Sequence, residues 1–145
     1  MSLTRQRLTL VMPGVSGMDR ARRLSQGRGW AAHSASQPGV TFFQMAGAVL
    51  ALFGRDDLAA DQAQPGAALG AGAVALAQNG PDEAATDAVL QAAVDAGATV
   101  LKRPERVFRG SCSGQFADPD GHVREIATNP FRPLAGNGSL TLPDA

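Results

Sequence analysis

The chain has 145 residues, of which 13 are basic and 13 acidic, so its formal net charge at neutral pH is zero. No part is basic enough to predict a nucleic-acid partner, no apolar run reaches the ~18 residues of a membrane span, and the N-terminus lacks the apolar stretch of a signal peptide, which together predict a cytoplasmic protein. Cys112 is the single cysteine, so an internal disulfide and a cysteine-based zinc site are excluded.

The first half of the chain predicts a strand, a helix and three further strands. The predicted bounds are 8–12 for a strand that resumes at 15, 18–26 for the helix, 28–32 for the next strand, and 40–45 and 48–53 for a hairpin. Pro13 interrupts the first strand, and Gly27 and Gly29 end the helix. The charged residues 55–61 are either a loop or a short helix, and the Ala- and Gly-rich residues 62–72 predict a flexible crossover.

The second half repeats this order of elements. The predicted bounds are 73–78 for a strand, 81–96 for a helix, 99–101 for a strand, 104–110 for a loop or irregular strand extension, and 111–117 and 122–127 for a closing hairpin. The repeat divides a single domain, 4–145, into module one at about 8–55, a crossover at 56–72, module two at about 73–128 and a tail at 129–145. When the closing hairpins are aligned, Ala51 occupies the repeat position of Glu125.

The turn Asp118-Pro119-Asp120-Gly121 joins the last two strands. Pro119 presets its φ, and Gly121 is expected at positive φ because only glycine adopts that conformation without strain. Alternation along 122–127 then places Glu125 on one face of the strand and His122 on the other. A carboxylate in mid-strand is costly unless it is hydrogen-bonded, paired or bound to a cation, although a partly exposed edge-strand glutamate is an equally open interpretation.

The run Phe-Ala-Asp-Pro-Asp-Gly-His-x-x-Glu over 116–125 resembles the C-terminal signature of the vicinal oxygen chelate superfamily, which holds the glyoxalase I, bleomycin-resistance and extradiol dioxygenase proteins. The resemblance covers about residues 8–140. It implies an α+β fold of two βαβββ modules whose sheets form a curved cup with the active site inside. In metal-using members the glutamate that matches Glu125 is the last of four metal ligands, which lie on the first and last strands of each module.

Three of those four positions carry apolar residues in this chain. They fall on Leu10, Ala51, Val74 and Glu125, and a shift of one or two residues brings in Thr9, Val11, Ala73 or Ala75, never a histidine. His122 points away from Glu125, and His33 lies in a polar loop. We therefore predict no metal site and no cofactor, because a lone carboxylate does not hold a catalytic ion.

Seven residues are candidates for contact with a ligand: Trp30, Phe43, Gln44, Phe53, Arg109, Gln115 and Glu125. Core packing is the favoured interpretation of the three aromatic residues among them, and Gln44, Arg109 and Gln115 are equally explained as solvated strand-end groups. Arg109 is the expected partner of Glu125 if its loop folds over the mouth of the cup.

The function predicted from these residues and this resemblance is metal-free binding of a small molecule, as in the bleomycin-resistance branch. The alternative is a metal-dependent lyase or dioxygenase with an atypical metal site and a divalent ion. A third interpretation is a cup filled by side chains, with only a dimer surface in use. The resemblance also implies a homodimer, with residues 62–72 and the tail near the partner.

Overall fold

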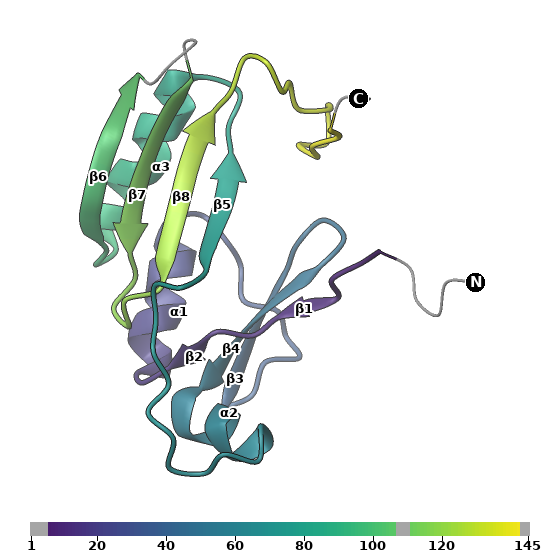
Figure 1. The fold of residues 1–145 in the computed structure, drawn as a ribbon, viewed down its shortest axis with the longest axis vertical. Coiled ribbons are helices and arrows are strands. Elements are labelled where there is room, and N and C mark those ends of the chain that lie inside the picture. The colour runs from purple at the N-terminus through teal and green to yellow at the C-terminus, as the bar shows by residue number, and fades with distance from the viewer. Residues whose placement is uncertain (1–5, 107–110, 143–145) are drawn as a thin grey trace.

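The structure is a computed structural model that describes residues 6–106 and 111–142. Within these ranges the chain forms two four-stranded sheets and three helices (Figure 1). Module one contains β1 (Leu10–Val11), β2 (Gly14–Val15), α1 (Met18–Gly27), β3 (Val40–Gln44), β4 (Val49–Gly54) and α2 (Arg55–Asp61). Module two contains β5 (Ala75–Asn79), α3 (Glu83–Asp95), β6 (Thr99–Arg106), β7 (Cys112–Ala117) and β8 (Val123–Thr128). The sheets are open and curved, and the predicted α+β fold of two modules is confirmed.

The first sheet is built around β4. Strands β1 and β2 both pair with it in parallel, and β3 pairs with it in the antiparallel sense. Pro13 separates β1 from β2 because it has no N–H to donate, yet its carbonyl oxygen still accepts from the Phe53 N–H at 3.0 Å. The two short strands are therefore one first strand with a break at the position that the sequence predicted.

The predicted strand at 28–32 is absent, which corrects the sequence analysis. The backbone turns back on α1, since Gly29 has φ +94° and the Trp30 N–H donates to the Ser25 carbonyl oxygen at 3.1 Å. This helix-ending turn places Trp30 over the core, where its ring lies 6.2 Å from the ring of Phe43. Because the Trp30 N–H is used in this helix-ending bond, it is not free to pair with a neighbouring strand.

The second sheet has the strand order β5-β8-β7-β6, with β5 parallel to β8 and the other neighbours antiparallel. Helix α3 covers one face (Figure 1), and its N-cap Asp82 accepts from the Ala85 N–H at 2.7 Å. Helix α1 of module one reaches this core as well, because Leu24 packs with Leu90 and Phe116. A Cβ on Gly27 would lie 2.4 Å from the Cβ of Ala96, so the close approach beside α3 requires glycine.

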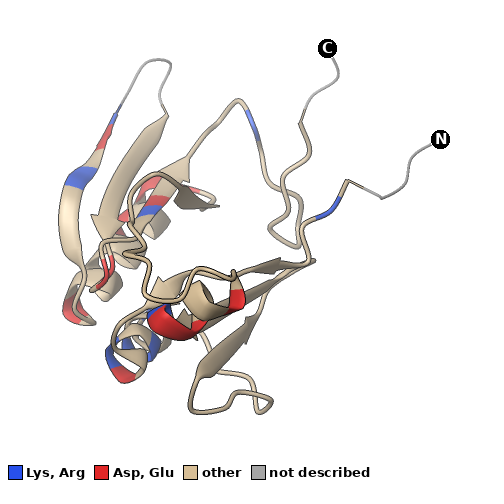
Figure 2. Cartoon of the chain, turned by 60° about the horizontal axis from the view of Figure 1, so that its bottom comes forward, with Lys and Arg blue, Asp and Glu red and all other residues tan. Residues whose placement is uncertain are grey.

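Basic and acidic residues are interspersed along the same helices and strands (Figure 2). The described part of the chain contains no helix that is long and apolar enough to cross a membrane.

The turn before β8 has the predicted conformation. Gly121 has φ +84°, and the Asp118 Oδ1 atom accepts hydrogen bonds from the N–H groups of Asp120 and His122, each at 2.9 Å. Both bonds hold the turn in place, so Gly121 cannot relax to negative φ without breaking them.

We expect Gly121→Ala to lower the free energy of unfolding by about 1–3 kcal/mol, because alanine is strained at positive φ. Space is not the cause, since the new Cβ would meet only Ala71 at an ordinary 3.6 Å. Urea melts measure the change, with Gly136→Ala as the control at an open glycine where φ is not positive. Equal stability of Gly121→Ala and wild type would contradict the assignment of strain to this turn.

Candidate functional site

The open face of the second sheet carries a polar row that runs across the strands. Glu125 lies opposite Gln115 on β7 and Ala77 on β5, and Gln115 lies opposite Lys102 on β6. The Gln115 Nε2 atom donates to the Glu125 Oε2 atom at 3.3 Å. Alternation places these side chains on the face away from α3, because Phe116 and Ile126 point into the core beneath it.

Lys102 is the member of this row that the sequence reasoning missed. The register of β6 against β7 shifts between Val100, which packs in the core, and Lys102. Without that shift Lys102 would follow Val100 onto the face toward α3. No local pattern in the sequence predicts the shift in the β6 register, so alternation alone assigns the Lys102 side chain to the wrong face.

The other predicted ligand residues do not join Gln115 and Glu125. Trp30 and Phe43 pack together in the core of module one. Gln44 is exposed and donates to the Met45 carbonyl oxygen at 2.9 Å. Phe53 lies on the far side of module one, beside α2, and lines a surface hollow there. Arg109, the expected partner of Glu125, lies outside the described residues.

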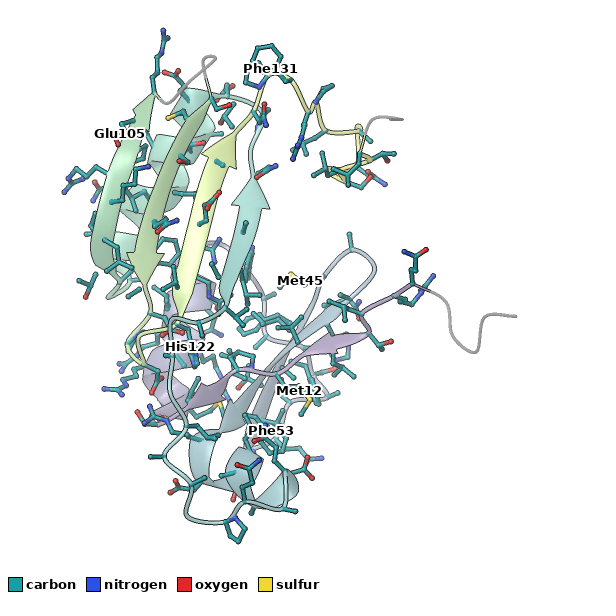
Figure 3. All side chains as sticks on the ribbon, in the orientation of Figure 1. Met12, Met45, Phe53, Glu105, His122 and Phe131 are labelled. Carbon is teal, nitrogen blue, oxygen red and sulfur yellow. The ribbon has the colours of Figure 1, made fainter. Side chains whose placement is uncertain are left out.

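A cleft of about 420 Å³ lies between the two modules. The first strands of both modules, α2, the end of the crossover and the turn before β8 enclose it, and His122 stands at this joint in Figure 3. Most of its wall is apolar, and the polar groups come from Arg55, Gln62, Asp120 and His122. The His122 Nε2 atom lies 2.6 Å from the Gly14 carbonyl oxygen, so in the neutral ring this nitrogen carries the proton.

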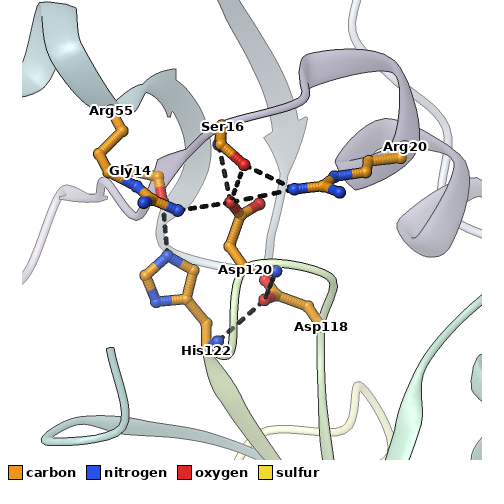
Figure 4. Close-up of polar contacts among 7 residues, drawn as sticks. All are labelled: Gly14, Ser16, Arg20, Arg55, Asp118, Asp120 and His122. Atoms are coloured by element: carbon orange, nitrogen blue, oxygen red, sulfur yellow. Dashed lines mark hydrogen bonds and ion pairs between the residues drawn. The ribbon is translucent and has the colours of Figure 1, made fainter. Parts of the chain in front are cut away.

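Asp120 connects module two to module one through a single carboxylate oxygen (Figure 4). Its Oδ1 atom accepts from the Ser16 N–H at 2.8 Å, the Ser16 hydroxyl at 2.6 Å and the Arg55 Nη2 atom at 2.7 Å. The Arg20 Nη2 atom lies 3.6 Å away. Burial acts to raise the pKa of Asp120, but the bonds from Ser16 and Arg55 and the charge of Arg20 outweigh it and the pKa is lowered.

This arrangement makes Asp120 an anchor rather than a proton acceptor, because its lowered pKa keeps it ionised and its Oδ1 atom is held by three donors, although its buried Oδ2 atom has no partner within the described residues. Cys112 is not an activated nucleophile either. Its thiol is buried, and burial followed by the charges of Glu83 and Asp87 raises the pKa of Cys112.

Comparison with known proteins places the chain in a family. Residues 15–126 match the model of the Glyoxalase/Bleomycin resistance protein/Dioxygenase superfamily. The chain belongs to this superfamily. A glyoxalase-related enzyme from Fulvimarina pelagi has a similar structure, with a TM-score of 0.87 and 32% sequence identity over 97% of this chain and 100% of that one. No curated protein sequence matches the chain.

More distant structures share the fold. A glyoxalase/bleomycin resistance protein/dioxygenase family enzyme from Burkholderia phytofirmans has a TM-score of 0.73 at 19% identity, over 84% of this chain and 98% of that one. A lactoylglutathione lyase from Agrobacterium tumefaciens has a TM-score of 0.67, also at 19% identity, over 88% of this chain and 97% of that one.

The strand register refines the positions at which superfamily members are expected to hold a metal. Leu10 pairs with Val49 and Ala75 pairs with Val123, which confirms that the two modules repeat each other in register. The residue opposite Glu125 on β5 is Ala77, whereas Val74, the position expected from the sequence, precedes the strand.

These residues do not fit a metal ion. Ala51 and Ala77 have no donor atom, and Gln115 is the only polar neighbour that the register places directly opposite Glu125 in the described residues. Nowhere in the ranges 6–106 and 111–142 do three His, Cys, Asp or Glu residues gather as a metal site requires.

The Asp120 network leads to a prediction about stability. We expect Asp120→Ala to lower the free energy of unfolding by about 2–4 kcal/mol, because three donors lose a charged acceptor that is fully buried. Asp61→Ala, at an exposed position on α2, is the matched control and should change little. Urea melts that give the two variants equal stability would contradict the anchoring role.

The same network predicts a pH dependence. Because the pKa of Asp120 is lowered on folding, its contribution is complete above the pKa of the unfolded carboxyl, ~4, and is lost as pH falls through the folded pKa. The stability gap between wild type and Asp120→Asn should therefore narrow as urea melts are taken from neutral pH to below pH ~4. A gap that stays constant would exclude this charge as the cause.

Proposed function

We propose that the protein binds a small molecule without a metal ion, on the open face of the second sheet. The observation that carries this proposal is the isolation of Glu125 from any second metal ligand among residues 6–106 and 111–142. Its neighbours in the sheet are Gln115 and Ala77, and Ala51 stands at its repeat position in module one. Metal affinity comes from several ligands acting together, so this donor set favours hydrogen bonding to an organic molecule over coordination of an ion.

The polar row supplies both kinds of hydrogen-bonding group. Glu125 accepts, and Gln115 offers an amide that can donate and accept. Their mutual bond is long at 3.3 Å, so a ligand can replace it at small cost. Lys102 is the cation of the row and lies 3.7 Å from the exposed Glu105, a pairing that is weak in water. We infer that the ligand has a polar end of mixed donor and acceptor character.

The alternative function is a metal-dependent lyase or dioxygenase with an atypical metal site. The glyoxalase-related enzyme from Fulvimarina pelagi motivates it, since the two chains align over nearly their whole lengths. It requires ligands other than those at the expected positions.

Calorimetric titration with Ni²⁺, Zn²⁺ and Mn²⁺ separates the two functions. We expect no tight one-to-one binding to the wild-type protein and no metal-dependent glyoxalase or dioxygenase activity, because Glu125 lacks partner ligands. The matched variants are Glu125→Ala, on the open face, and Asp87→Ala, which removes an exposed carboxylate from α3 on the other face of the same sheet.

Tight binding of one ion that disappears in Glu125→Ala and persists in Asp87→Ala would replace the binding function with the enzymatic one. The binding function itself is tested by native mass spectrometry of the purified protein. We expect a small-molecule adduct that is lost in Glu125→Ala and retained in Asp87→Ala. An adduct that both variants retain would place the ligand elsewhere.

We also propose that the protein is a homodimer in which the crossover and the tail face the partner. Large apolar side chains are exposed in the tail, with Phe131 at 61%, Leu140 at 43% and Leu142 at 65%. Burial of such groups stabilises an interface in proportion to their apolar area. Light scattering at micromolar concentration should give twice the mass of one chain, and a monomeric mass would contradict the assembly.

A further inference from the structure

Two arginines lie on the opposite side of β8 from Glu125. Arg28 follows α1 in module one, and Arg124 belongs to β8 in module two. Arg124 is only 5% exposed, although arginine is rarely buried without a partner. Alternation points Arg124 away from the open face, so this pair is distinct from the polar row around Glu125.

The surroundings of both guanidinium groups are largely apolar. The Arg28 guanidinium carbon lies 4.1 Å from the centre of the Trp30 ring and 5.4 Å from that of Phe116. Phe116 is also a direct cross-strand neighbour of Arg124, with Leu76 on its other side. The Arg28 Nη2 atom donates to the Gln78 Oε1 atom at 2.5 Å. Residues of both modules thus enclose the pair.

The hydrogen-bonding capacity of the pair is incompletely used. The Nε atoms of Arg28 and Arg124 are both buried, and neither has a hydrogen-bond partner within the described residues. A buried N–H group without an acceptor costs about 1–3 kcal/mol, and more when the group is charged. Two such donors in one place indicate a missing acceptor.

The local charge indicates the same. Burial, followed by the charge of Arg124, lowers the pKa of Arg28 to about 10, so Arg28 remains positive at neutral pH. Burial also lowers the pKa of Arg124, against the charge of Asp118, which acts to raise it. A guanidinium group stays protonated in proteins, so Arg124 is positive as well. The Asp118 Oδ1 atom already accepts two backbone N–H groups. Two cations therefore face one occupied carboxylate in a poorly solvated place, which favours a bound anion.

We propose that a small oxyanion, either a carboxylate or a phosphate, binds between Arg28 and Arg124 and connects the two modules. Its oxygen atoms would accept the free N–H groups, and arginine is the residue best suited to such charge-assisted bonds. This site goes beyond the proposed function, because it lies on the other face of β8 and does not involve Glu125.

Thermal unfolding in a zwitterionic buffer at constant ionic strength tests the site, with sodium phosphate and sodium acetate as the two probes. We expect the melting temperature of the wild type to rise and then saturate as the site fills. Arg28→Met and Arg124→Met keep the apolar stem but remove the charge, and each should weaken the apparent affinity by about tenfold or more. Arg103→Met, at an exposed position on β6, is the control and should behave like wild type.

Every outcome of these melts either supports or overturns the anion site. A saturable response to one or both probes that is lost in Arg28→Met and Arg124→Met supports the site, and the responding probe names the oxyanion. No saturable response in the wild type overturns the proposal. An equal response in wild type and both variants also overturns it, because the anion then binds elsewhere. If Arg124→Met does not fold, the response of Arg28→Met, at a half-buried position, tests the site alone. The response of Glu125→Ala shows whether the anion binds at the open face instead.

Discussion

The structure depends on one carboxylate. Asp120 lies in the turn before the last strand of module two, and its Oδ1 atom accepts three hydrogen bonds from Ser16 and Arg55 of module one. The turn can present this oxygen because Gly121 adopts positive φ and Asp118 holds the neighbouring N–H groups. Charge-assisted bonds in a buried place are strong and directional, so they set how the two modules meet. Asp120 also lines the cleft between the modules. The packing of α1 on α3 supports the same joint and places Arg28 beside Phe116.

Alternation along β8 places an acidic and a basic side chain on opposite faces of the strand. Glu125 points to the open face and meets Gln115, whereas Arg124 points inward between the modules. Neighbouring residues on one strand thus serve different environments, one half-exposed and acidic, the other buried and basic. The superfamily fold supplies the frame, and the side chains at a few positions decide what it can bind. Replacement of potential ligands by Ala51 and Ala77 leaves Glu125 available for an organic partner.

The two proposed sites make different demands on the fold. The open face uses a row of polar groups that exists within one sheet, so it needs only the register of β6, β7 and β8. The arginine pair needs both modules, since Arg28 and Trp30 come from the first and Arg124 and Phe116 from the second. An anion there would connect the same two modules that Asp120 connects.

Local patterns in the sequence were sufficient for most of the elements. The break at Pro13, the helix that ends near Gly27 and the turn at Gly121 are consequences of backbone chemistry that each residue carries with it. The face of Glu125 followed from strand alternation, and its correspondence with Ala51 followed from the repeat. The tertiary structure decided the rest, because the rest depends on contacts between distant residues. Trp30 packs on Phe43 and does not form the predicted strand. The shifted register of β6 places Lys102 opposite Gln115. Asp120 accepts hydrogen bonds from Ser16 and Arg55 of the other module. Such contacts depend on packing and register, which no short stretch of sequence contains.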